Sequence, residues 1–253
     1  MPEETPTDPR STEIWIDEGP VNAEQWRDLA GDAIARSARP RRAARLDPEL
    51  ANEISDSVGA KQADDVIERL AAAADALERE RFGDVRRILA PVLRKHPNIA
   101  APHEMVGLAE YRLGSWSKAA TALERAQELD QTPETLPVLA DCYRALGKHR
   151  RVEETWATLK SASPRHEVMA EGRIVMAGSC ADRGDLKAAI ALLAGSGKRP
   201  KRIREHHLRQ WYALADLYDR SGDVVSARRW FTVVAEQDPQ FVDVRQRLRA
   251  LGR

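Results

Sequence analysis

The sequence predicts an all-α fold in which helix-turn-helix units stack one on the next. Three observations predict it. Charged residues make up 32% of the chain and aromatic residues only 5%, with abundant Ala and Leu, which favours helices with solvated faces. No run of alternating Val, Ile and Thr and no Asn-Gly or Asp-Gly turn indicates a strand or hairpin. Finally, related segments recur along the chain, which is typical of stacked repeats.

The recurring segments each contain a turn followed by the start of a helix with a small or β-branched residue at a fixed place. The numbering of these residues gives spacings of 34, 33, 37 and 38: Val85, Ala119, Val152, Ala189 and Ala227. Turn glycines keep step with them at Gly114, Gly147, Gly184 and Gly222. The second helix of each unit is expected to end near Pro97, Gln131, Pro164 and Pro239.

Residue size within each unit suits two closely packed helices. Small residues on the first helix let the second approach closely, at Gly107, Ala140, Ala177 and Ala215. Large residues on the second helix are expected to fill the space between units, at Leu123, Trp156, Leu193 and Phe231. The turn glycines tolerate a positive φ at the end of the first helix. These residues are therefore expected to form the core.

The pattern resembles the tetratricopeptide repeat, a helix-turn-helix of 34 residues. The last copy matches best, with signature residues at Trp211, Leu214, Ala215, Tyr218, Gly222, Ala227, Phe231 and Pro239. The resemblance covers about 64–239 and implies a right-handed α-solenoid over 61–253, with about five repeats and a C-terminal capping helix. The cap is expected after Pro239, with a polar outer face at Arg245, Gln246 and Arg249.

The first sixty residues divide into two parts. Residues 1–20 read as a disordered or extended arm, in which Ile14–Ile16 either packs on the protein's own surface or forms a short motif for a partner. Residues 21–60 read as N-terminal helices and an Arg-rich linker, with a capping box at Asn22–Gln25 and a helix start at Asp47-Pro48. The Arg run is either a solvated linker or a phosphate-binding patch: Arg36, Arg39, Arg41, Arg42 and Arg45.

Signatures of catalysis and metal binding fail on inspection. Gly195-Ser196-Gly197-Lys198 lacks the first glycine and the final Ser or Thr of a phosphate-binding loop. His206 and His207 are adjacent, so on a helix they point about 100° apart and do not readily share a metal. Cys142 and Cys180 stand far apart and are expected to be core thiols. We expect no cofactor, no metal and no enzymatic activity.

In tetratricopeptide proteins the first helix of each repeat lines a concave groove, so the resemblance implies a partner-binding surface. Its expected members are Glu104, Leu108, Tyr111, Arg112, Asp141, Arg144, Arg209, Tyr212, Asp216 and Arg220; further positions are Glu171, Ile174, Asp182 and Asp219. Members that grip chaperone tails use Lys and Asn in the groove to hold a carboxylate, whereas Asn22, Asn52 and Asn98 all lie elsewhere. A protein or peptide partner of mixed charge is therefore expected.

Three functional hypotheses follow. The first is a protein-interaction scaffold or adaptor, because solenoid surfaces bind extended segments or whole domains. The second is an RNA- or ribonucleoprotein-associated factor that uses basic clusters at 36–45 and 198–209, the latter including Lys198, Arg199, Lys201, Arg202 and Arg204. The third is an enzyme with an unrecognised site. A net charge of zero gives no general attraction to nucleic acid.

The sequence predicts a cytoplasmic protein. The acidic N-terminus MPEETPTDPR is unlike a secretory leader, and no run of about 20 apolar residues suggests a membrane span. The use of Arg in preference to Lys is typical of bacteria with G+C-rich genomes. Membrane association is not expected, and the oligomeric state is left open.

Overall fold

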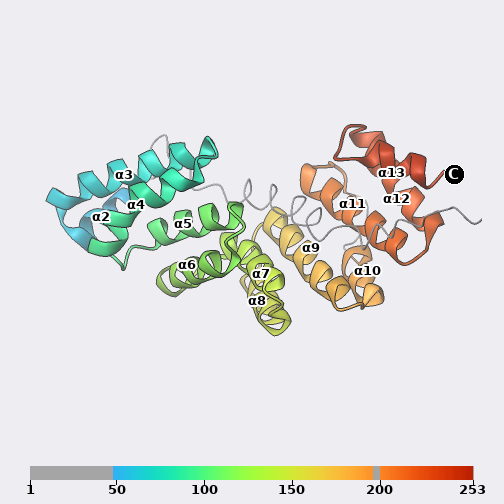
Figure 1. The fold of residues 1–253 in the computed structure, drawn as a ribbon, viewed down its shortest axis with the longest axis horizontal. Helices are drawn as coiled ribbons and strands as arrows, with labels where there is room; N and C mark the ends of the chain where they lie inside the picture. The colour runs from blue at the N-terminus through green and yellow to red at the C-terminus, as the bar shows by residue number, and fades with distance from the viewer. Residues whose placement is uncertain (1–47, 196–199, 253) are drawn as a thin grey trace, which may run out of the picture.

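The computed structural model describes residues 48–195 and 200–252, and every α-helix and 3-10 turn in this part follows the previous one without an intervening strand (Figure 1). The elements are α2 (Pro48–Val58), α3 (Ala60–Glu78), α4 (Phe82–Lys95), α5 (Ala100–Arg112), α6 (Trp116–Leu129), η1 (Pro133–Thr135), α7 (Leu136–Ala145), α8 (His149–Ala162), α9 (His166–Asp182), α10 (Leu186–Ala194), α11 (Glu205–Arg220), α12 (Val224–Gln237) and α13 (Val244–Ala250). The all-α prediction is confirmed for the described residues.

Packing is mainly between helices that follow one another along the chain. In addition, α5, α7, α9 and α11 contact one another in that order, although a second helix separates each from the next in sequence. We call these four helices the central row. The elongated arrangement in Figure 1 follows from this pattern, because each helix pair adds to the end of the previous one.

The turns within the helix pairs adopt the geometry that the glycines predict. Gly114, Gly147, Gly184 and Gly222 have φ between 68° and 82°. At the first of them, the Gly114 and Ser115 amides donate to the carbonyls of Tyr111 and Glu110, both at 2.9 Å. These two bonds close the end of α5 in the manner of a Schellman motif. In the first helix pair a glutamate takes the glycine's place, since Glu80 has φ 57°.

Close approach within the helix pairs is confirmed where the small residues predict it. A Cβ added to Gly107 of α5 would lie 2.6 Å from Cγ of Leu123 in α6, so only glycine fits between these helices. Ala140, Ala177 and Ala215 are buried on their first helices, and Leu123, Leu193 and Phe231 are fully buried on the second ones. Trp156 is only partly buried. Both cysteines are buried and free.

The expected helix ends are also close to those observed. α4, α6, α8 and α12 stop one or two residues before Pro97, Gln131, Pro164 and Pro239. The final helix, α13, is shorter than the predicted segment, and its Arg245, Gln246 and Arg249 are exposed as expected. At the other end α2 begins at Pro48, and Ile54 joins Val66 and Leu89 in one core cluster. The predictions for Ile14–Ile16, Asn22–Gln25 and the Arg run at 36–45 lie outside the described residues.

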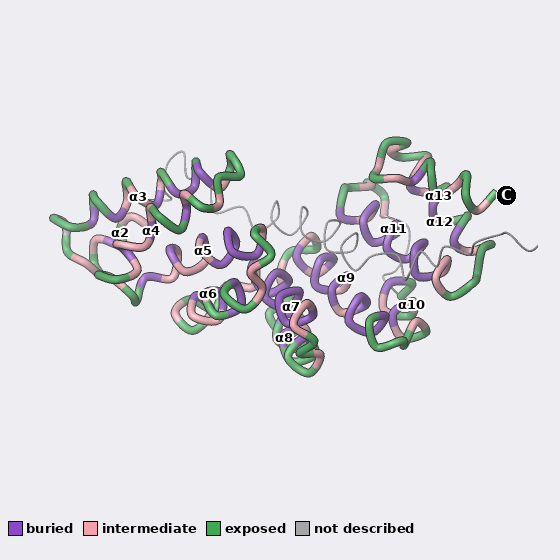
Figure 2. Tube along the Cα trace, in the orientation of Figure 1, coloured by how far each residue is buried: buried purple, intermediate pink, exposed green. Residues whose placement is uncertain are grey.

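Burial differs sharply between the two kinds of helix (Figure 2). In α7, residues 136–144 are buried without interruption, and in α11 the same holds for residues 208–217. By contrast, α8 buries only Val152, Thr155 and Leu159, and α12 only Ala227, Phe231 and Val234, each set on one side of its helix. The central row therefore forms the interior of the structure, and the second helices form its outer layer.

Candidate binding surface

The residues predicted to line a groove all lie on the central row. Most of them are buried: Leu108, Tyr111, Asp141, Arg144, Arg209, Tyr212 and Asp216. Glu104, Arg112 and Arg220 are of intermediate exposure. Burial of a charged side chain requires ion pairs and hydrogen bonds to offset the lost hydration. The polar partners of these residues therefore show what they do in the folded protein.

A chain of polar contacts links α5 to α7 and α7 to α9. The Tyr111 hydroxyl donates to Oδ2 of Asp141 at 2.7 Å, and Arg144 Nη1 lies 3.3 Å from the other oxygen of that carboxylate. Arg144 Nε in turn donates to Asp182 Oδ2 at 2.6 Å. Burial and the neighbouring Asp141 raise the pKa of Tyr111 well above its usual value, so its hydroxyl keeps its proton.

Similar contacts link α9, α11 and α13. Arg209 Nη1 of α11 donates to Glu171 Oε1 of α9 at 2.7 Å, while its Nη2 donates to Glu205 at 2.8 Å. Further along, Arg247 of α13 bonds to Asp216 and lies 3.1 Å from Asp219. The Tyr212 hydroxyl donates to Asp243, which precedes α13. We call the contacts that join different helices the polar ladder. They are Tyr111–Asp141, Arg144–Asp182, Arg209–Glu171, Tyr212–Asp243 and the contacts of Arg247 with Asp216 and Asp219.

The polar ladder gives most of the predicted groove residues a structural role, because they hold successive first helices in a fixed relation. Their contact with a partner stays a prediction. The more accessible positions are Glu104, Arg112 and Arg220. Arg112 Nη2 also lies 2.9 Å from Glu80, and its guanidinium stands 5.2 Å from the Phe82 ring centroid. A partner on this side would meet a surface that already contains both signs of charge.

The basic cluster at 198–209 is divided by the structure. Lys198 and Arg199 lie outside the described residues, and Lys201 and Arg202 are exposed. Arg204 Nη1 bonds to Glu167 Oε1 at 2.8 Å, and Arg209 belongs to the polar ladder. Two of these cations are therefore neutralised by carboxylates, which weakens the local positive field available to phosphate groups.

The histidine pair at the start of α11 packs ring against ring. The His206 and His207 centroids are 4.0 Å apart, and Nδ1 of His206 lies 3.9 Å from Glu167 Oε1. Burial, together with the charge that His207 would carry, lowers the pKa of His206 to about 4. His206 is thus neutral at pH 7. Within residues 48–195 and 200–252, no group of three or more His, Cys, Asp or Glu is arranged to hold a metal ion.

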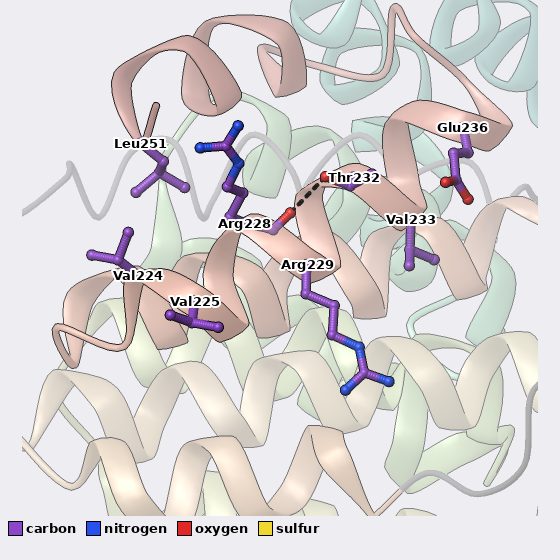
Figure 3. Close-up of a pocket in the computed structure, with 8 residues that line it drawn as sticks. All are labelled: Val224, Val225, Arg228, Arg229, Thr232, Val233, Glu236 and Leu251. Carbon is purple, nitrogen blue, oxygen red and sulfur yellow. Dashed lines mark hydrogen bonds between the residues drawn. The ribbon is translucent and has the colours of Figure 1, made fainter. Parts of the chain in front are cut away.

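Sequence reasoning missed a second surface, on the outer layer at the C-terminal end (Figure 3). A shallow pocket of about 550 Å³ lies along α12 and is lined by Val224, Val225, Arg228, Arg229, Thr232, Val233, Glu236 and Leu251. Val225 is 81% exposed, which is high for a large apolar side chain. The signal available in the sequence was the Val224-Val225 pair, because both valines precede the apolar stripe of Ala227, Phe231 and Val234 that forms the buried side of α12.

Comparison of the sequence with protein families gave no match, and comparison with curated proteins found no significant relative. None of the described helices combines the length and the apolar character needed to cross a bilayer.

Proposed function

We propose that this chain is an intracellular scaffold of the tetratricopeptide type, a right-handed solenoid that binds a segment of another protein along its central row. The observation that carries the proposal is the continuity of that row: four first helices contact one another in order, and ion pairs join α7 to α9 and α9 to α11. A continuous surface of this kind suits an extended ligand.

The polar ladder supports the proposal because it fixes the geometry of the surface before a partner arrives. Arg144 of α7 pairs with Asp182 of α9, and Arg209 of α11 pairs with Glu171 of α9, so a buried arginine ties each of these neighbouring units to the next. A preorganised surface loses less conformational entropy on binding than a mobile one. In this proposal the ladder residues hold the shape, and Glu104, Arg112 and Arg220 contact the partner.

The turn geometry supports the repeat assignment. The four glycines that keep the sequence period all have positive φ, and each stands between the two helices of one pair. Gly107, which matches a small-residue position of the repeat, stands where Leu123 of the second helix approaches so closely that an added Cβ would lie 2.6 Å from its Cγ. These features recur with the spacing that led to the resemblance, although the comparisons above name no family.

The test begins with affinity capture of the tagged full chain from its native lysate, with and without nuclease. We expect a nuclease-resistant protein at near-stoichiometric amount. Its binding to the purified chain, measured by calorimetry, is expected to weaken at least about tenfold in an Arg112→Ala and Arg220→Ala double variant. Arg150→Ala, at a side chain of α8 that is 91% exposed, serves as the control and should bind like the wild type.

Wild-type affinity in the double variant would place the binding site away from the central row. Loss of all captured proteins after nuclease treatment would favour the RNA-associated alternative. The structure itself adds no observation in favour of that alternative, because Arg204 and Arg209 are already paired with carboxylates.

A further inference from the structure

The outer face of α12 carries an exposed stripe that does not contribute to the core. Val225, Arg229, Thr232 and Glu236 recur at i, i+4, i+7 and i+11, so they fall on one line along the helix. The buried residues Ala227, Phe231 and Val234 lie on the opposite side of the same helix. Figure 3 shows these four side chains among those that line the pocket, together with Val224, Arg228, Val233 and Leu251.

The charges of this stripe have an order that makes it complementary to itself. Arg229 and Glu236 are both exposed, and among the described residues neither forms an ion pair. They lie at equal distances in sequence from a point between Thr232 and Val233. If a second α12 packs antiparallel about a two-fold axis at that point, Arg229 of each copy faces Glu236 of the other. A parallel arrangement would instead place like charges opposite each other.

The remaining positions fit the same antiparallel arrangement. Arg228 falls opposite Gln237, which is exposed and offers a hydrogen-bond acceptor. Val224 and Val225, which are 45% and 81% exposed, fall opposite Phe241 and Gln240 in the segment that follows the other α12, close to Val242, which is 56% exposed. Apolar side chains at the two ends of the contact would thus be shielded from water together.

We propose that the stripe Val225, Arg229, Thr232 and Glu236 is an isologous interface through which two copies of this chain form an antiparallel dimer. The two-fold axis passes between Thr232 and Val233, and two symmetric Arg229–Glu236 ion pairs flank it. A contact centred on one helix from each copy is small, so the dimer dissociates in the micromolar to millimolar range. The interface lies on the outer layer and leaves the central row available.

The decisive experiment is a charge swap on the full-length chain, measured by sedimentation equilibrium from about 1 μM to about 1 mM. In the Arg229→Glu variant, an acidic side chain at position 229 of each copy faces Glu236 of the other copy. In the Glu236→Arg variant, a basic side chain at position 236 of each copy faces Arg229 of the other. Each single variant is expected to weaken the dimer at least about tenfold. The double variant Arg229→Glu with Glu236→Arg is expected to restore it, and an equimolar mixture of the two single variants is expected to form a heterodimer.

Formation of the heterodimer in the mixture also shows that both single variants are folded. A wild-type chain that stays monomeric at about 1 mM would overturn the proposal. A dimer that ignores the charge swaps would place the interface elsewhere and overturn it equally.

Cross-linking provides a second measurement at the two-fold axis. Thr232→Cys is expected to give a disulfide-linked dimer under mild oxidation, because each substituted residue lies directly next to the axis and the two therefore come close to each other. Thr158→Cys is the matched control, since Thr158 is also an exposed threonine whose hydroxyl donates to the carbonyl four residues earlier. Equal cross-linking at both positions would contradict the proposed axis. Cys142 and Cys180 are buried and do not compete.

Discussion

Single glycines in this chain have different physical roles, and substitution by alanine is expected to change the free energy of unfolding differently at each of them. A Cβ on Gly172 would lie 2.1 Å from Leu159 Cδ2, whereas one on Gly184 or Gly83 would meet nothing within 4 Å. Gly184 has φ 82°, but Gly83 lies within α4 without a positive φ. We expect Gly172→Ala to lower the free energy of unfolding by about 2 kcal/mol or more through overpacking. Gly184→Ala should cost about 1 kcal/mol through backbone strain.

The third variant is expected to be more stable than the wild type. Gly83→Ala is expected to raise the free energy of unfolding by about 0.5 kcal/mol, because alanine loses less backbone entropy on entering a helix. Urea denaturation followed by circular dichroism measures all three values. A Gly172→Ala variant as stable as the wild type would show that α8 and α9 have room to separate, and would contradict the close approach inferred for this pair.

Buried polar groups join helices along the central row. Removal of one hydroxyl tests how much such a group contributes to the free energy of unfolding. Tyr111 of α5 donates to Asp141 of α7, whose carboxylate is 1% exposed. We expect Tyr111→Phe to lower the free energy of unfolding by about 1.5–3 kcal/mol, because it removes a hydrogen bond to a buried charge. Denaturant unfolding at pH 7 provides the measurement.

Tyr143→Phe is the matched control for Tyr111→Phe. The Tyr143 hydroxyl also donates to a carboxylate, Glu124 Oε1 at 2.6 Å, and it accepts from Arg151 Nη2 at 2.7 Å. The Glu124 and Arg151 side chains are 38% and 52% exposed, so both retain contact with water when the hydroxyl is removed. Its loss is expected to cost about 0.5–1 kcal/mol. Equal losses for the two variants would mean that burial of the accepting carboxylate has no influence on the strength of the contact.

Across the whole molecule, the sequence period predicted which residues stand at turns and at close approaches, since these depend on local geometry. Gly114 and Gly107 illustrate the two cases. The period did not predict the polar ladder. Arg144 and Asp182 are 38 residues apart, and whether they face a partner or each other depends on the angle between successive units. That angle is set by packing of the whole stack, and a repeat pattern does not encode it.

The stacking of the helices predicts how far the destabilising effect of one substitution extends along the molecule. α7 and α9 meet at Gly178, where an added Cβ would lie 2.7 Å from Cζ of Arg144, a side chain held by Asp141 and Asp182. Gly178→Ala therefore disturbs this junction and is expected to cost about 1–3 kcal/mol locally. Because helices contact mainly their neighbours, α3 and α12 share few contacts with the junction and should keep their stability.

Hydrogen exchange followed by mass spectrometry tests this expectation for each helix separately. In Gly178→Ala, protection in α7, α8 and α9 is expected to fall by about 5- to 150-fold, whereas protection in α3, α4 and α12 should change by less than about threefold. A uniform loss along the chain would instead show that the helices unfold as one cooperative unit, in which distant cores depend on each other. A local loss of protection would show that each helix depends for its stability mainly on the helices that it contacts, as the order of contacts along the central row requires.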